Sequence, residues 1–217
     1  MYRRLQRIIS VMRADGILAG LRWLFQTTYH RIVPQKQAIW FADLTEVDDK
    51  NFCLPDGVEV KRYASRKKLD ETDYETLVEK GTALMGSGAR ILIDERLKNG
   101  AVLWLVKENG NLAGYRWTIV RDTLLGTYVP HTEFDVHEFG VEVFSGYRGR
   151  NIFQVFVKHA LITLKIEGYK RFFTEVHLWN ERSMKAMAKT DLRKIGTATR
   201  FNFFGRNVVI WYDMCNK

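Results

Sequence analysis

The sequence predicts an α/β fold built on one mixed β-sheet, and three observations support this prediction. Apolar residues alternate in short runs typical of strands, and elsewhere they recur with helical spacing. These segments follow in the order strand, two helices, three strands, helix, strand, helix, two strands. Finally, a strand, a basic glycine-bearing turn and a long helix succeed one another over 141–168, as is typical of α/β proteins.

The composition excludes several classes of protein. With 217 residues, of which 46% are hydrophobic and 13% aromatic, the chain can form a substantial core and is not intrinsically disordered. Cys53 and Cys215 lie far apart, which argues against a disulfide framework or a cysteine zinc site and suits the cytoplasm. The five histidines show no metal-ligand spacing, so we expect no metal. No apolar run approaches the ~20 residues of a membrane span.

Basic charge gathers near the N-terminus. Residues 1–36 hold seven basic residues and one acidic residue, which accounts for +6 of the total net charge of +9. Apolar residues recur with helical spacing over 3–14 and 17–28, so we expect two amphipathic helices. Residues 1–33 could pack on the rest of the protein or on a second subunit, or they could lie on the anionic inner face of a membrane.

The first half of the body follows this basic segment. We interpret 35–57 as a linker, because it carries an acidic patch and ends in Pro-Asp-Gly. The expected elements are a strand 58–63, a helix 66–80 ended by Gly81, Gly86 and Gly88, a helix 89–98, and strands 101–107 and 112–120. Asn109-Gly110 between the last two strands predicts a tight hairpin.

The second half begins with 121–135, which we interpret as a loop. The expected elements after it are a strand 136–144, a helix 152–166 that stops at Gly168, a strand 171–178, a helix from 180 to about 194, and a closing hairpin of strands 197–204 and 208–214.

The turn that leads into the long helix predicts an anion site. It points the free N–H groups and the positive end of a helix out of a glycine-bearing turn, where proteins commonly bind phosphate. Arg148 and Arg150 add positive charge at the same place.

This turn resembles the acetyl-CoA-binding segment of the GNAT N-acyltransferase superfamily, in which a strand ending in Val-x-Pro leads into Arg/Gln-x-x-Gly-x-Gly/Ala. Val143 matches the valine and Arg148 the first residue of the loop motif. Ser145, Asn151 and Phe153 stand where the family has proline and two glycines. Asn151 is a mild change, because asparagine tolerates left-handed backbone. Phe153 would lie in the first helical turn, where its side chain could point into the core.

The succession of elements is similar to the GNAT fold over about 58–214. The resemblance implies a mixed central sheet that is splayed between its fourth and fifth strands, where the cofactor is held. We therefore divide the chain into a basic amphipathic helical leader (1–40) and a GNAT-like acyltransferase domain (41–217). A second family motif, Asn-x-x-Ala/Ser, matches at Asn180 and Ser183, but Thr197 replaces the aromatic residue that often follows Lys-x-Gly.

The resemblance also implies how acyl-CoA binds, as a co-substrate and without a metal. The backbone of Val143 and Ser145 would hold the pantetheine arm, and Asn180 with Ser183 would border its thiol end. The pyrophosphate would rest on the backbone N–H groups of the loop, which comprises Arg148, Gly149, Arg150, Asn151 and Ile152.

Acyl transfer to an amine also needs a proton acceptor near the thioester. Alternation places Glu138 and Glu142 on one face of their strand, and the resemblance puts the family's glutamate nearer Glu138, with Glu142 in reserve. Either glutamate could instead be structural, and His137, on the opposite face, is expected to be structural. The family's proton donor is often a tyrosine at the position of Met187, so Tyr212 on the last strand, Tyr147 beside the phosphate loop, or water would have to replace it.

These observations predict an enzyme that moves an acetyl or other acyl group from acyl-CoA to a primary amine of a small molecule by direct attack on the thioester. An amino sugar or an amino acid derivative would be a suitable acceptor. The alternative is a catalytically silent CoA-binding or scaffold domain. A nucleic-acid-binding module fits less well, because the positive charge concentrates in 1–36 and no strand carries the aromatic motif of an RNA-recognition sheet. We therefore expect a cytoplasmic protein without a nucleic-acid partner.

Overall fold

The computed structural model describes residues 36–50, 52–85, 88–120, 128–203 and 206–214. The strands are β1 (Gln37–Asp43), β2 (Val58–Tyr63), β3 (Val102–Glu108), β4 (Asn111–Val120), β5 (Asp135–Val143), β6 (Arg171–His177), β7 (Arg193–Phe203) and β8 (Arg206–Met214). The α-helices are α3 (Glu71–Met85), α4 (Ala89–Lys98), α5 (Ile152–Ile166) and α6 (Glu181–Met187), and short 3₁₀ turns are η1 (Arg66–Lys68) and η3 (Ser145–Tyr147).

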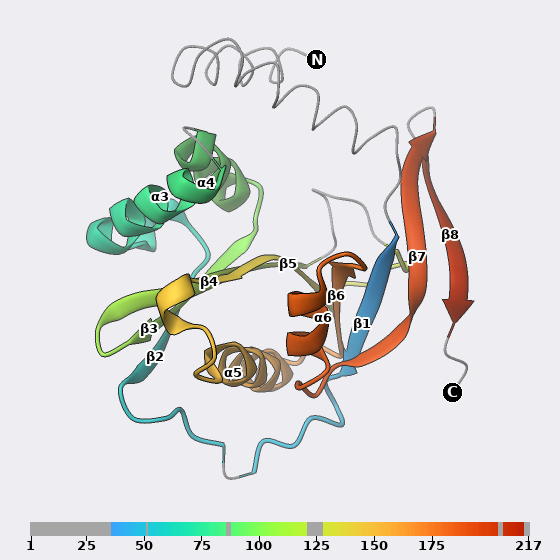
Figure 1. Cartoon of the computed structure of the whole chain (residues 1–217), viewed down its shortest axis with the longest axis horizontal. Helices are drawn as coiled ribbons and strands as arrows, with labels where there is room; N and C mark the ends of the chain where they lie inside the picture. The colour runs from blue at the N-terminus through green and yellow to red at the C-terminus, as the bar shows by residue number, and fades with distance from the viewer. Residues whose placement is uncertain (1–35, 51, 86–87, 121–127, 204–205, 215–217) are drawn as a thin grey trace.

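The described elements form three layers, with α3 and α4 on one face of the sheet and α5 and α6 on the other (Figure 1). The mixed α/β fold expected from the sequence is therefore confirmed. The two helices expected over 3–14 and 17–28 lie outside the described residues and stay predictions. Among the described helices, none is long and apolar enough to cross a membrane.

One strand was not expected. The sheet order is β2-β3-β4-β5-β6-β1-β7-β8, so β1 lies between β6 and β7. All seven of its residues pair antiparallel with β6, from Gln37 opposite His177 to Asp43 opposite Arg171. The interpretation of 35–57 as a linker was therefore wrong for its first part, and the expected domain boundary after residue 40 falls inside β1.

Three other boundaries also differ from expectation. α3 continues through Gly81 to Met85, because a single glycine costs a helix only about 1 kcal/mol relative to alanine and packing outweighs it. The helix expected from 180 to 194 ends at Met187. Its last expected residues belong instead to β7, which begins at Arg193 and pairs with β1.

The core has two parts, one on each face of the sheet. On one face, α5 buries a helical stripe against the sheet, formed by Phe156, Val157, Ala160, Leu161 and Leu164. On the other face, α3 and α4 pack on the inner residues of β3 and β4 through Tyr74, Leu77, Ile93 and Leu97. The sheet is therefore buried on both sides over β3 and β4.

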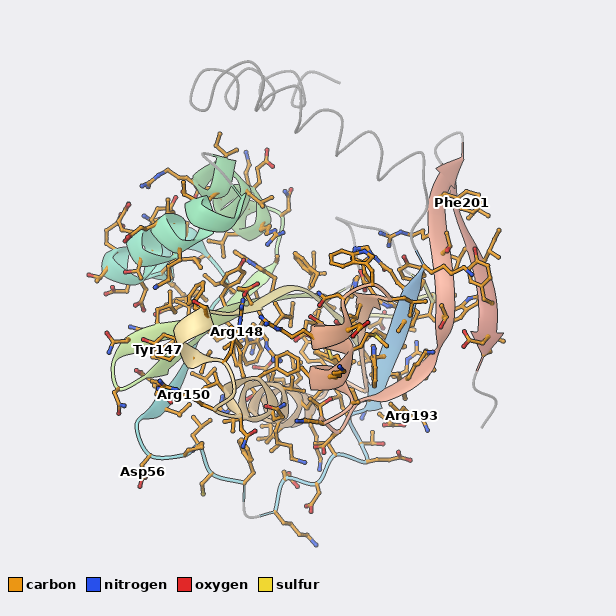
Figure 2. The ribbon with its side chains drawn as sticks, viewed as in Figure 1. Asp56, Tyr147, Arg148, Arg150, Arg193 and Phe201 are labelled. Carbon is orange, nitrogen blue, oxygen red and sulfur yellow. The ribbon has the colours of Figure 1, made fainter. Side chains whose placement is uncertain are left out.

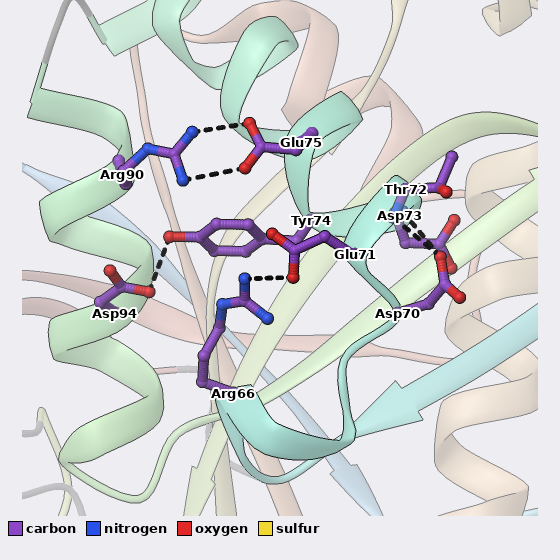
Figure 3. A network of polar contacts seen from close by, with 9 residues as sticks. All are labelled: Arg66, Asp70, Glu71, Thr72, Asp73, Tyr74, Glu75, Arg90 and Asp94. Carbon is purple, nitrogen blue, oxygen red and sulfur yellow. Dashed lines mark hydrogen bonds and ion pairs between the residues drawn. The ribbon is translucent and has the colours of Figure 1, made fainter.

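Polar contacts fix α3 against α4 (Figure 3). The hydroxyl of Tyr74 donates to Asp94 at 2.9 Å. Arg90 donates two hydrogen bonds to Glu75, at 2.9 and 2.6 Å. Arg66 lies over the ring of Tyr74, 3.6 Å from its centroid. The tyrosine is thus held at its ring and at its hydroxyl, so the two helices keep one orientation on the sheet.

A matched pair of substitutions tests whether β1 is a core strand. Ile39 on β1 is 2% exposed, whereas Ile210 on β8 is 45% exposed. Ile39→Ala should lower the free energy of unfolding by about 2–5 kcal/mol, because it removes buried methyl groups and leaves a cavity. Ile210→Ala should change it by only about 0.5 kcal/mol. Urea denaturation measures both, and equal losses would contradict the central placement of β1.

Candidate functional site

The turn between β5 and α5 presents main-chain N–H groups. Gly149 and Asn151 have positive φ angles of 78° and 60°, a conformation that turns successive amides toward one side. Among the described residues, no backbone carbonyl accepts a hydrogen bond from the amides of 149–151. The first turn of α5, which begins at Ile152, adds N–H groups that no helix can satisfy internally. The geometry therefore suits an anion, as the sequence indicated.

The two arginines of this turn, which are labelled in Figure 2, each contact a carboxylate. Arg148 donates from Nε to the carbonyl of Val143 at 2.8 Å and from Nη2 to Glu142 at 2.5 Å. Arg150 donates to Glu108 at 2.7 Å, and its side chain is 57% exposed. Arg148 thus ties the turn back to the end of β5, whereas Arg150 lies at the surface and pairs with Glu108 of β3.

The residues of the turn from Arg148 to Asn151 are exposed. Phe153, which stands in place of a family glycine, packs against the core on the α5 side. Val143 packs against the same core, and Ser145 is exposed. The large side chain at 153 therefore packs against the core and is only partly exposed.

Beside this turn, the sheet opens. β5 and β6 pair in parallel over four positions, the last of which is Glu138 opposite Thr174. Beyond that point β5 stays with β4, while β6 stays with β1. The splay between the fourth and fifth strands of the expected order is thus confirmed, because β1 is an addition and β5 and β6 are the strands in question.

A bulge in β5 changes which residues share a face. Trp117 lies opposite Phe139 and Tyr115 opposite Glu142, so one residue of β4 faces Gly140 and Val141 together. Gly140 has φ of 58°, which glycine adopts without strain. Glu142 therefore joins Phe139 on the α3/α4 face. The expectation that Glu138 and Glu142 share a face was wrong, because strict alternation does not hold across a bulge.

Glu138 lies on the α5 face as part of a buried ion pair. Its carboxylate is 2.9 Å from Nη1 of Arg116 on β4, and both side chains are 0% exposed. The Arg116 guanidinium lies 4.1 Å from the ring centroid of Phe156 on α5. Burial raises the pKa of Glu138, and the nearby guanidinium opposes that effect. The pair is enclosed beneath α5 at the point where the strands separate.

Comparison with known proteins agrees with this geometry. A sequence model of the acetyltransferase (GNAT) family matches residues 67–190, which is more than half of the chain. The chain belongs to the GNAT family. No curated protein matches it in sequence.

Several solved GNAT structures share the fold. A GNAT-family protein from Novosphingobium aromaticivorans has a TM-score of 0.52 at 17% identity, covering 77% of this chain and 64% of its own. A GNAT acetyltransferase from Colwellia psychrerythraea has a TM-score of 0.53 at 11% identity, covering 90% and 63%. A tandem GNAT protein of clavulanic acid biosynthesis, solved without AcCoA, has a TM-score of 0.50 at 13% identity, covering 81% and 55%. The chain thus spans about half to two thirds of these proteins, and the likeness concerns the fold.

The structure does not bring every predicted residue of the GNAT site together. Asn180 caps α6, and its side chain accepts a hydrogen bond from the amide of Ser183 at 3.1 Å. Both follow β6 directly, so they lie beyond the splayed end of that strand. Tyr212 lies on β8, with β1 and β7 between it and β6, and its side chain stacks with the ammonium of Lys36 at 4.1 Å.

A pair of residues at the splay was missed by the sequence analysis. His137 on β5 and Glu175 on β6 are in contact through Nε2 and Oε2 at 2.5 Å. Both lie on the face opposite α5, where His137 was expected to be structural. The histidine could have been noticed because it precedes Glu138 on the strand that leads to the turn, but its partner comes from a strand 38 residues away.

A double-mutant cycle tests the buried ion pair of the GNAT core. Glu138→Leu should lower the free energy of unfolding by about 3–5 kcal/mol, because Arg116 then becomes an uncompensated buried charge. Combining it with Arg116→Met should recover most of that loss. Urea denaturation of the two single variants and the double variant measures the coupling, and purely additive losses would show that the two charges do not depend on each other.

Proposed function

We propose that this GNAT-family chain transfers an acyl group from acyl-CoA to a primary amine of a small molecule by direct attack on the thioester. The observation that carries the proposal is the splay between β5 and β6 next to the amide-lined turn at 149–151. A thioester cofactor with a diphosphate needs both features, an anion site and an adjacent gap between strands.

Each part of the site has a proposed task. The amides of 149–151 and of the first turn of α5 bind the diphosphate, with Arg148 and Arg150 adding charge. The edge of β5 that faces the splay near Val143 and Ser145 holds the pantetheine arm. Asn180 and Ser183 border the pantetheine site just after the end of β6. The hydrogen bond from the Ser183 amide to the Asn180 side chain fixes the start of α6 there.

We assign positioning tasks to the two glutamates expected to act as bases. Arginine holds each of them, since Arg116 contacts Glu138 at 2.9 Å and Arg148 contacts Glu142 at 2.5 Å. Glu138 also has no exposed surface through which an amine could reach it. The departing thiolate takes its proton from water in this proposal, because Tyr212 is separated from β6 by two strands.

The pairing of both glutamates also favours a second candidate function, a domain that binds CoA without catalysis. The two candidates share the same binding site and differ in turnover alone. Release of free CoA thiol from acetyl-CoA in the presence of an amine separates them, because the silent domain would release none.

Thermal unfolding with acetyl-CoA, followed by thiol release, tests the proposal. Acetyl-CoA should raise the melting temperature in a concentration-dependent way, since it binds the folded state. Thiol release should then depend on one of the amines glucosamine, glycine or L-lysine. Stabilisation without thiol release would favour the silent domain, and an unchanged melting temperature would contradict both candidates.

Arg148→Ala should weaken acetyl-CoA binding about 10- to 100-fold, because it removes a charge and frees the turn from the end of β5. Calorimetry measures the dissociation constant. The matched control is Arg193→Ala, on β7 beside Phe41 and away from the turn (Figure 2), which should leave the constant unchanged. Equal affinity in the Arg148 variant and the native protein would contradict the assignment of the turn.

A further inference from the structure

We propose that His137 and Glu175 form the proton acceptor of the transfer reaction, with His137 taking the proton and Glu175 positioning its ring. This inference rests on the proposed function. It assigns a residue to the removal of the amine proton, for which Glu138 and Glu142 had been predicted. Two ionisable groups from separate strands meet here at 2.5 Å, with side chains 3% and 15% exposed.

The pair lies at the apex of the splay. His137 belongs to the paired part of β5, opposite Phe173, whereas Glu175 is the first residue of β6 beyond the last parallel pair. Their contact therefore crosses from one strand to the other where the gap begins. A thioester held in the gap, with its diphosphate at 149–151, would have its reacting carbon toward this apex.

The face of the sheet also favours this pair over Glu138. Glu138 points beneath α5, among core residues, and has no exposed surface. His137 and Glu175 point to the opposite face, as do Phe139 and Phe173 next to them. His137 is itself only 2% exposed, whereas Glu175 keeps 15% of its side chain exposed, so the pair reaches the surface through Glu175. The aromatic neighbours lower the local dielectric and strengthen the contact of the imidazole with the carboxylate.

The other charged and titratable groups near the pair come from three elements. His131, which precedes β5, stacks on Phe173 with 5.0 Å between centroids and meets the His137 ring edge-on at 5.7 Å. Tyr128 interacts electrostatically with Glu175, and the guanidinium of Arg200 lies 5.0 Å from the centroid of the Tyr128 ring. Burial raises the pKa of Tyr128 to about 12, so this phenol stays protonated at neutral pH. The carboxylate of Glu138, on the opposite face of the sheet, interacts electrostatically with both His137 and Glu175.

The chemical step balances without any further reactant. The lone pair of the free amine forms the C–N bond at the thioester carbon, and the C–S bond breaks with its electron pair leaving on sulfur. The nitrogen gives one proton to His137, whose imidazolium is stabilised by the Glu175 carboxylate. The thiolate takes up one proton from water, and His137 returns its proton to the solvent, so the products are the amide and CoA with a free thiol.

The test is steady-state acyl transfer from acetyl-CoA to the most active amine among glucosamine, glycine and L-lysine. His137→Gln should lower kcat about 10²- to 10⁴-fold, the usual contribution of a general base, with the acetyl-CoA dissociation constant unchanged. Glu175→Gln should lower kcat less and should move the half-maximal point of the kcat–pH profile to lower pH, because the imidazolium loses a stabilising charge. A purely structural role would not move that profile.

The matched control is His159→Gln on α5, a histidine of the opposite face that contacts Phe52 and takes no part in the proposed site. Its kcat and pH profile should match those of the native protein. Native kcat in His137→Gln, or an unmoved profile in Glu175→Gln, would overturn the inference while leaving the acyltransferase proposal standing. If the native protein released no thiol with any of the three amines, the proposed function would fail and the inference would fail with it.

Discussion

The early end of the β5–β6 pairing is the constraint on which the rest of the site depends. Parallel pairing stops after Glu138 and Thr174 because each strand then follows its other neighbour, β5 with β4 and β6 with β1. Since β1 pairs with β6 along its whole length, it holds β6 away from β5. The gap thus results from the strand order of the sheet. It opens beside the turn at 149–151, whose amides bond to no backbone carbonyl of the described part of the chain.

In the same region, charged side chains form pairs on both faces of the sheet. The bulge at Gly140 sends Glu142 to the α3/α4 face, where Arg148 holds it, while Glu138 stays with Arg116 beneath α5. His137 and Glu175 remain at the apex on the face opposite α5. A buried charge pair under the helix and an imidazole–carboxylate pair above it therefore flank the start of the gap, and each pair joins neighbouring strands.

The sequence predicted best what local patterns determine. The turn 145–151, α5 and the Asn109-Gly110 hairpin were predicted because turn residues and periodicity lie within a few positions of one another. β1 was missed because its seven residues lead into an acidic patch, and its central place depends on pairing with β6, from Gln37 with His177 to Asp43 with Arg171, far along the chain. The predicted face of Glu142 was wrong because a β-bulge interrupts the alternation of side chains without leaving a periodic pattern in the sequence. The His137–Glu175 contact was missed because it joins two strands that α5 separates along the chain.

A crystal structure of the protein with CoA would show whether the turn and the gap bind the cofactor together. The diphosphate should lie against the amides of 149–151, and the pantetheine arm should enter the gap between β5 and β6, with its sulfur toward the apex at Glu138 and Thr174. A diphosphate bound elsewhere, or β5 and β6 paired beyond that apex in the complex, would contradict this prediction.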